Sequence, residues 1–169
     1  MATVNLATAA NANLTSISAI RNASETKFPY LIDATLDFAA AATAKGSGLA
    51  TSDVIQVLTV PAKTVVLAAG IEYVTAVAGG VSALTISLGI TGVLATTWLS
   101  AFDLFGATVG AYPVTNSAAY PMTIGVANDT IDVLLAGVTG TLATGVIRVW
   151  ALVQDTQGVP NPGLALPGN

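Results

Sequence analysis

Hydrophobic and polar residues alternate most clearly between residues 52 and 88, and the pattern there predicts three β-strands. Residues 54–60 are apolar and mostly β-branched, and Pro61 ends this run because proline fixes φ and has no N–H to donate to a sheet. A second strand is expected from 64 to 76. The third follows Gly79 and Gly80 and has a period of two over 84–88. Because paired glycines favour tight hairpin turns, we expect the three strands to pair in sequence as an antiparallel meander.

Four more segments have the composition of strands. Residues 28–38 alternate and should place one set of side chains inward: Tyr30, Ile32, Ala34, Leu36 and Phe38. Residues 122–126 and 130–135 should form a hairpin through the turn at 127–129, and 146–154 form the last strand. Seven or eight short strands with turns between them predict an all-β fold, either an antiparallel β-sandwich or a jelly roll.

Two internal segments lack the alternation. Residues 39–48 lose the pattern and are expected to form a flexible loop. A spacing of four, four and three predicts a short helix or an ordered loop near 94–105, whose aligned side chains are Leu94, Trp98, Phe102 and Phe105.

The ends of the chain differ from its middle, so we expect three parts. Residues 1–26 are small and polar and predict an N-terminal arm long enough to lie across a neighbouring subunit; a disordered terminus or an ordinary first strand is the alternative. Residues 27–154 form the β-sandwich domain. Residues 155–169 contain several prolines and glycines and predict a C-terminal tail.

Charge is scarce in this chain. Only 8% of residues are charged, against roughly 25% in an average soluble domain, while 53% are hydrophobic and the mean hydropathy is +0.75. A surface with so few charges is expected to bury apolar area against partners or against copies of itself.

The same composition excludes several kinds of function. The net charge is −4 and the five cations are scattered, which argues against nucleic acid as a partner. The absence of cysteine and histidine excludes Cys/His zinc sites and Ser-His-Asp triads. No phosphate-binding loop is present, and a cation site at Asn128, Asp129 and Asp132 lacks the glycine-punctuated loop typical of calcium. We therefore expect no enzyme, no cofactor and no metal.

A membrane span also has to be considered, because residues 73–102 carry no charge over a length that would cross a bilayer. Gly79, Gly80, Gly89 and Gly92, with Thr and Ser recurring between them, fit strands and turns better than a helix in lipid. We expect no membrane partner.

Candidate interface residues are the large aromatic side chains and one cation. Arg148 and Trp150 alternate on the last strand, and both residue types are enriched where binding energy concentrates. Pairing of Arg148 with a strand aspartate within the chain is the alternative. The full set of candidates is Arg148, Trp150, Trp98, Tyr112 and Tyr120.

Two parts of the chain resemble a known group of proteins. Residues 53–75, DVIQVLTVPAKTVVLAAGIEYVT, resemble the strand, VPA-turn, strand unit of small virion structural proteins of tailed bacteriophages, especially those of cyanobacteria. Residues 128–133, NDTIDV, and 145–150, GVIRVW, resemble the C-terminal strands of the same group. The resemblance spans residues 29 to 155.

The resemblance implies a non-enzymatic capsid decoration or cement protein. Such a protein would dock on the major capsid protein at the surface of the capsid, as a homotrimer, without a cofactor. A tail, adaptor or fibre component of the virion is the alternative. A carbohydrate-binding β-sandwich module with Trp98, Trp150 or Tyr112 as the stacking platform is the second alternative.

Overall fold

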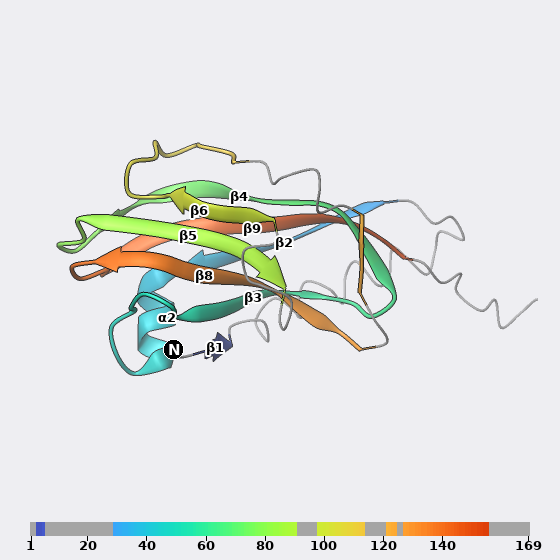
Figure 1. Ribbon diagram of the computed structural model, residues 1–169, viewed down its shortest axis with the longest axis horizontal. Helices are drawn as coiled ribbons and strands as arrows, with labels where there is room; N and C mark the ends of the chain where they lie inside the picture. Colours follow the sequence, from blue (N-terminus) through green and yellow to red (C-terminus); the bar gives the residue numbers. More distant parts are fainter. Residues whose placement is uncertain (1–2, 6–28, 91–97, 114–120, 125–126, 156–169) are drawn as a thin grey trace, which may run out of the picture.

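The computed structural model describes residues 3–5, 29–90, 98–113, 121–124 and 127–155. They form two β-sheets packed face to face, with one short helix at a corner (Figure 1). The elements in chain order are β1 (Thr3–Asn5), β2 (Tyr30–Asp37), α2 (Phe38–Lys45), β3 (Val54–Val60), β4 (Thr64–Ala78), β5 (Ala83–Ile90), β6 (Leu99–Asp103), β7 (Met122–Thr123), β8 (Asp129–Thr139) and β9 (Thr144–Asp155).

The strand order is that of a jelly roll. Sheet A has the order β1-β3-β8-β5-β6, and sheet B has the order β2-β9-β4-β7. Apart from β1, the strands are interleaved so that β2 to β3, β4 to β5, β6 to β7 and β8 to β9 each connect one sheet to the other, which is the double Greek-key arrangement. Of the two architectures that the sequence predicts, the described strands adopt the jelly roll.

The strands predicted between residues 52 and 88 are confirmed, but their pairing as a meander is wrong. β3 and β5 lie in sheet A and β4 lies in sheet B, so Gly79 and Gly80 lead from one sheet to the other rather than around a hairpin. The predicted hairpin of 122–126 with 130–135 is wrong for the same reason, because β7 pairs with β4 while β8 pairs with β3 and β5. Alternation along the chain predicts a strand but does not indicate with which strand it pairs.

The core lies between the two sheets and is built from the inward sides of their central strands. β9 follows the predicted alternation closely, whereas Asp132 of β8, expected to point outward, is buried at 3% exposure. The inward side chains of both strands are fully buried: Ile131, Val133, Leu135, Ile147, Val149, Ala151 and Val153. β2 contributes Ile32 and Leu36 from the face predicted to be inward. These aliphatic side chains come from segments far apart in the sequence, so the core joins both halves of the chain.

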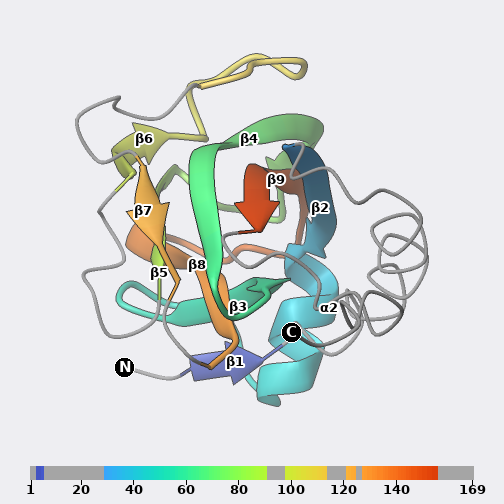
Figure 2. The ribbon, with the colours of Figure 1, turned by 90° about the vertical axis from the view of Figure 1, so that its right-hand side faces the viewer.

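The one described helix lies where a loop was predicted. α2 begins after Asp37, whose carboxylate accepts a hydrogen bond from the N–H of Ala39 at 2.8 Å, and ends at Gly46 in the left-handed conformation. Between these caps the run of alanines favours a helix, and burial of Phe38 and Ala41 fixes it to the corner of the sandwich beside β1 and β2 (Figure 2).

Where the structure describes the segment predicted as a short helix or an ordered loop near residues 94–105, it contains a strand instead. Residues 99–103 form β6, which pairs with β5, and the Ser87 hydroxyl accepts a hydrogen bond from the N–H of Ala101 at 2.9 Å. Trp98 precedes this strand and packs in the core, with 1% of its surface exposed. Leu94 lies outside the described residues.

The three-part division of the chain stays a prediction. Thr3–Asn5 adds to the edge of sheet A as β1, parallel to β3, which fits the alternative of a first strand on its own domain. Residues 6–26 of the predicted arm and residues 156–169 of the predicted tail lie outside the described part of the chain.

Two of the connections between sheets meet at one end of the sandwich, on the left in Figure 1. The N–H of Ser82 donates to the carbonyl of Thr139 at 2.8 Å, and the N–H of Ala143 donates to the carbonyl of Ala78 at 3.0 Å. A Cβ added at Gly140 would lie 2.3 Å from the carbonyl oxygen of Gly80. The two connections are therefore packed backbone to backbone.

We expect Gly140→Ala to destabilise the fold more than Gly80→Ala. Both glycines have a φ of 89°, so alanine meets the same conformational strain at each, on the order of 1 kcal/mol. Only Gly140 adds a steric overlap, because a Cβ at Gly80 would meet nothing within 4 Å. Denaturant unfolding should show a loss of roughly 3 kcal/mol for Gly140→Ala. Equal losses for the two variants would contradict the packing of these connections.

Candidate interface on the outer face of sheet B

The outer face of sheet B carries two of the five predicted interface residues, Arg148 and Trp150, in a regular array. Because Ile147, Val149, Ala151 and Val153 of β9 point inward, the residues between them point outward. Strand register then sets three rows across β2, β9 and β4: Leu31–Leu152–Ala68, Asp33–Trp150–Gly70 and Thr35–Arg148–Glu72. The face is thus apolar at one end of the array and charged at the other.

Arg148 is held by two groups on this face. Its Nη2 lies 2.7 Å from Oε2 of Glu72 on the neighbouring strand and donates a hydrogen bond to the Tyr112 hydroxyl at 3.2 Å. Within the chain, Arg148 therefore pairs with a glutamate and not with the strand aspartate that was the alternative. The negative charge of Asp33 on β2 adds a further favourable interaction with Arg148. Side chains of Arg148 and Glu72 remain 38% and 25% exposed, so the pair can still be reached from outside.

The contacts among Glu72, Tyr112 and Arg148 raise the pKa values of Tyr112 and Arg148. Hydrogen bonding to Glu72 is the largest cause that raises the pKa of Tyr112 above its ordinary value, with Arg148 acting in the opposite direction. Burial opposes the charge of Arg148, but the Tyr112 hydroxyl and the Glu72 carboxylate outweigh it, and the pKa of Arg148 is raised. At neutral pH the cluster therefore consists of a neutral phenol and an ion pair with no net charge.

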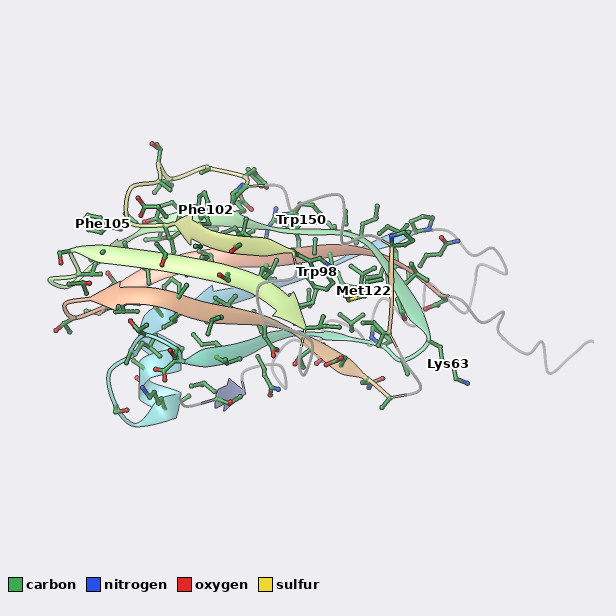
Figure 3. All side chains as sticks on the ribbon, in the orientation of Figure 1. Lys63, Trp98, Phe102, Phe105, Met122 and Trp150 are labelled. Carbon is green, nitrogen blue, oxygen red and sulfur yellow. The ribbon has the colours of Figure 1, made fainter. Side chains whose placement is uncertain are left out.

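The Trp150 indole lies against β4 because the residue of β4 paired with Trp150 is Gly70, which has no side chain. A Cβ added at Gly70 would lie 2.7 Å from Cζ2 of Trp150 and 3.2 Å from the Pro113 carbonyl oxygen. The Trp150 Nε1 and the Arg148 Nε are buried atoms with no hydrogen-bond partner among the described residues. Figure 3 labels Trp150, which belongs to β9.

Tyr112 is presented by a loop that is fixed to the edge of β4. The N–H of Tyr73 donates to the Ala111 carbonyl at 3.0 Å, and the N–H of Gly110 donates to the Tyr73 carbonyl at 2.7 Å. These bonds continue the edge of sheet B where β7 no longer pairs with β4. Tyr112 itself is 50% exposed, so a large aromatic ring projects from a rigid support.

The structure divides the five predicted interface residues into three groups. It brings Arg148, Trp150 and Tyr112 together on one face, whereas the burial of Trp98 in the core removes it as a surface anchor. Tyr120 lies outside the described residues. Sequence reasoning missed Glu72 as the partner of Arg148, since the pairing of β4 with β9 is visible only in the register.

Other chemistry is sparse in the described part of the chain. The oxygens of the acidic turn make hydrogen bonds within the fold: Asn128 Oδ1 accepts from the N–H of Ala62, and Asp129 Oδ1 accepts from the N–H of Thr130. Among the residues that the structure describes, no three Asp, Glu, His or Cys side chains are grouped so as to hold a metal ion. No described helix has the length and hydropathy of a membrane span.

Comparison with known proteins finds similarity only among solved structures. No protein-family model matches the chain, and no curated protein sequence matches it. A chain of the cyanophage Pam1 capsid asymmetric unit is similar with a TM-score of 0.59 and 18% identity, over 76% of this chain and 86% of that one. A chain of the capsid of Ralstonia phage GP4 has a TM-score of 0.54 and 12% identity over the same shares.

A third structure, the acidic stable capsid of the Helicobacter pylori bacteriophage KHP30, gives a TM-score of 0.47 at 14% identity, over 75% of this chain and 90% of that one. The first two chains share the fold of this protein. The resemblance expected from residues 29–155 is therefore confirmed at the level of the fold.

We expect Gly70→Ala to lift Trp150 off the sheet. The new Cβ would overlap the indole, so the ring must move outward at a cost of roughly 1–3 kcal/mol. The emission of Trp150 should shift to the red as its ring gains solvent, while the buried Trp98 gives a constant background. In a Trp150→Ala background the same glycine replacement should lose most of its effect on the free energy of unfolding, and an undiminished effect would contradict this contact.

We also expect the titration of Tyr112 to depend on Glu72. Since the carboxylate raises the pKa of Tyr112, Glu72→Gln should lower that pKa, and Arg148→Met should raise it further by removing a favourable cation. Tyrosine ¹³Cζ chemical shifts followed against pH measure this, with Tyr112→Phe identifying the resonance. An unchanged Tyr112 titration in Glu72→Gln would show that the cluster does not form in solution.

Proposed function

We propose that this chain is a non-enzymatic structural component of a phage virion, and specifically a capsid decoration or cement protein. The observation that carries the proposal is the similarity of fold to chains of two phage capsids, which covers 76% of this chain and 86% of each of those chains. Because the match covers most of both chains, it involves the jelly roll as a whole and not a small module of it.

The surface of the chain supports an assembly role. Its fraction of charged residues, 8%, is about a third of the average for soluble domains. The described residues also include five large hydrophobic side chains that are exposed. Large permanent interfaces are richer in apolar area than transient ones, and their anchors are enriched in Trp, Tyr and Arg. The outer face of sheet B offers Trp150, Tyr112 and Arg148 together, so we assign the contact with the major capsid protein to this face.

The proposal includes the location and the assembly state. The chain would lie on the outer surface of the capsid as a homotrimer. It makes no use of a nucleic acid, a membrane or a cofactor.

Cryo-electron microscopy of purified particles tests the proposal directly. We expect density that fits this jelly roll at repeated positions over the outer surface of the shell, at a copy number set by the capsid symmetry. Density restricted to the tail would replace this proposal by the tail, adaptor or fibre component. Absence of the chain from purified particles would refute both assignments.

A binding experiment tests the proposed docking face. We expect Tyr112→Ala to weaken binding of the purified protein to capsids that lack it by on the order of 10- to 100-fold, as for an aromatic anchor. Tyr112→Phe is the matched control, because it keeps the ring and loses only the hydroxyl, and should bind nearly as the unaltered chain does. Equal binding of all three proteins would exclude this face as the contact.

One observation favours a carbohydrate-binding role as the second candidate. Trp150 and Tyr112 share an exposed face, as the aromatic side chains of a sugar-binding platform would, whereas Trp98 is buried and cannot serve. Glycan-array binding by the unaltered chain that is lost in Trp150→Ala would support it, and the absence of binding across a broad array would dismiss it.

A further inference from the structure

One end of the sandwich is built from three segments without a charged residue: 74–83, 105–110 and 139–144. We call it the crossover end, because it contains the connections of β4 to β5 and of β8 to β9. Phe105 joins it through its N–H, which donates to the Leu84 carbonyl at 3.2 Å, beside the start of β5. Figure 3 places Phe105 at this end and Lys63 at the opposite end of the sandwich.

Exposed apolar side chains concentrate at the crossover end. Of the five large hydrophobic residues exposed in the described part of the chain, three lie here: Val74 at 43%, Phe105 at 46% and Val109 at 49%. Most of the residues around them are alanine, glycine and threonine, which add little bulk and no charge. Exposed apolar residues that gather in one region mark interaction sites in soluble proteins.

Glu72, two residues before Val74, is paired with Arg148, and two further carboxylates that flank the crossover end are engaged in local contacts. Asp103 accepts a hydrogen bond from the N–H of Gly106 at 2.9 Å, and Asp37 caps α2 through the N–H of Ala39 at 2.8 Å. Each of these two carboxylates is thereby held by its own segment. The apolar surface is therefore flanked by acidic groups but not crossed by them.

The crossover end is also rigid. Its two connections are joined by the hydrogen bonds of Ser82 with Thr139 and of Ala143 with Ala78, and a Cβ at Gly79 would lie 2.2 Å from the Ala143 Cβ. The loop bearing Val109 is fixed to β4 at Tyr73. A surface that is already ordered loses little conformational entropy when it is covered, so binding to it is favoured.

We propose that the crossover end is the surface through which copies of this chain contact one another. Each copy has a net charge of −4, so two copies repel wherever their acidic residues face each other. The crossover end is a place where they can approach without bringing carboxylates together, and its apolar residues need no complementary charge. The outer face of sheet B, with Asp33, Glu72 and Arg148, suits a different partner that supplies opposite charges.

This inference deepens the proposed function by naming the surface that joins the copies, and it rests on the part of that proposal in which the chain self-associates. It does not depend on where the protein sits in a particle. The oligomer would place three or more apolar side chains of each copy in the contact and leave the outer faces of sheet B free.

Sedimentation velocity of the full chain at high micromolar concentration tests the inference. We expect the unaltered chain to be oligomeric and Phe105→Asp to weaken association by on the order of 100-fold, since a carboxylate would be buried without a partner. Leu31→Asp is the matched control: Leu31 is 51% exposed, and its row meets β4 at Ala68, six residues before Val74 and so about 20 Å away along the strand. It should remain oligomeric.

Each outcome is decisive. A monomeric unaltered chain, an oligomeric Phe105→Asp, or a Leu31→Asp that dissociates equally would overturn the inference. Val109→Asp provides a second variant, and circular dichroism shows whether each variant is folded. Because the contact is apolar, association should persist in high salt, and its loss there would also overturn the inference. Binding to capsids is measured separately, so a chain that self-associates but does not bind capsids refutes the decoration role alone.

Discussion

The fold depends on the insertion of β8 and β9 between strands that precede them in the chain. β8 lies between β3 and β5 in sheet A, and β9 lies between β2 and β4 in sheet B. Without these two strands neither sheet is continuous, and their inward side chains, from Ile131 to Val153, would leave the middle of the core empty. Contacts of such long sequence separation carry a high loop-closure entropy, so we expect folding to be slow for a domain of this length.

The few charges of this chain are distributed unevenly over the fold. Most charges of the described residues lie on the outer face of sheet B, at the acidic turn and around α2, whereas the segments of the crossover end carry none and are flanked by Asp103. The chain therefore presents surfaces of two kinds: a mixed face with aromatic rings, an ion pair and Asp33, and an uncharged end of small and apolar residues. A molecule with two unlike surfaces can contact its own copies and a different protein at the same time.

The sequence predicts the strands of this protein far better than their partners. The alternation at 28–38, 84–88 and 146–154 is local, and it appears as β2, β5 and β9 with the expected inward faces. Pairing is decided by contacts between distant segments, so Gly79 and Gly80 were assigned to a hairpin when they lead between sheets. The helix was missed although its signals were present, Asp37 before an alanine run and Gly46 after it.

The candidate interface shows the same limit. Alternation on the last strand correctly predicts that Arg148 and Trp150 share a face, but Glu72 and Tyr112 reach them only through strand register and a loop fixed to β4. Trp98 and Phe102 are separated by four residues, which aligns side chains on a helix and also on a strand, so this spacing could not distinguish β6 from a helix. Burial of Trp98 follows from its tertiary surroundings alone.

The edge of β2 affects whether copies of the chain can stack strand to strand. This strand of eight residues pairs only with β9 among the described strands, and an edge of that length is a template onto which another chain can add a strand. Two of the nine acidic residues of the protein, Asp33 and Asp37, lie on it. Like charges on a strand edge discourage edge-to-edge stacking, so open-ended fibres of the kind that poorly charged β-proteins form are disfavoured.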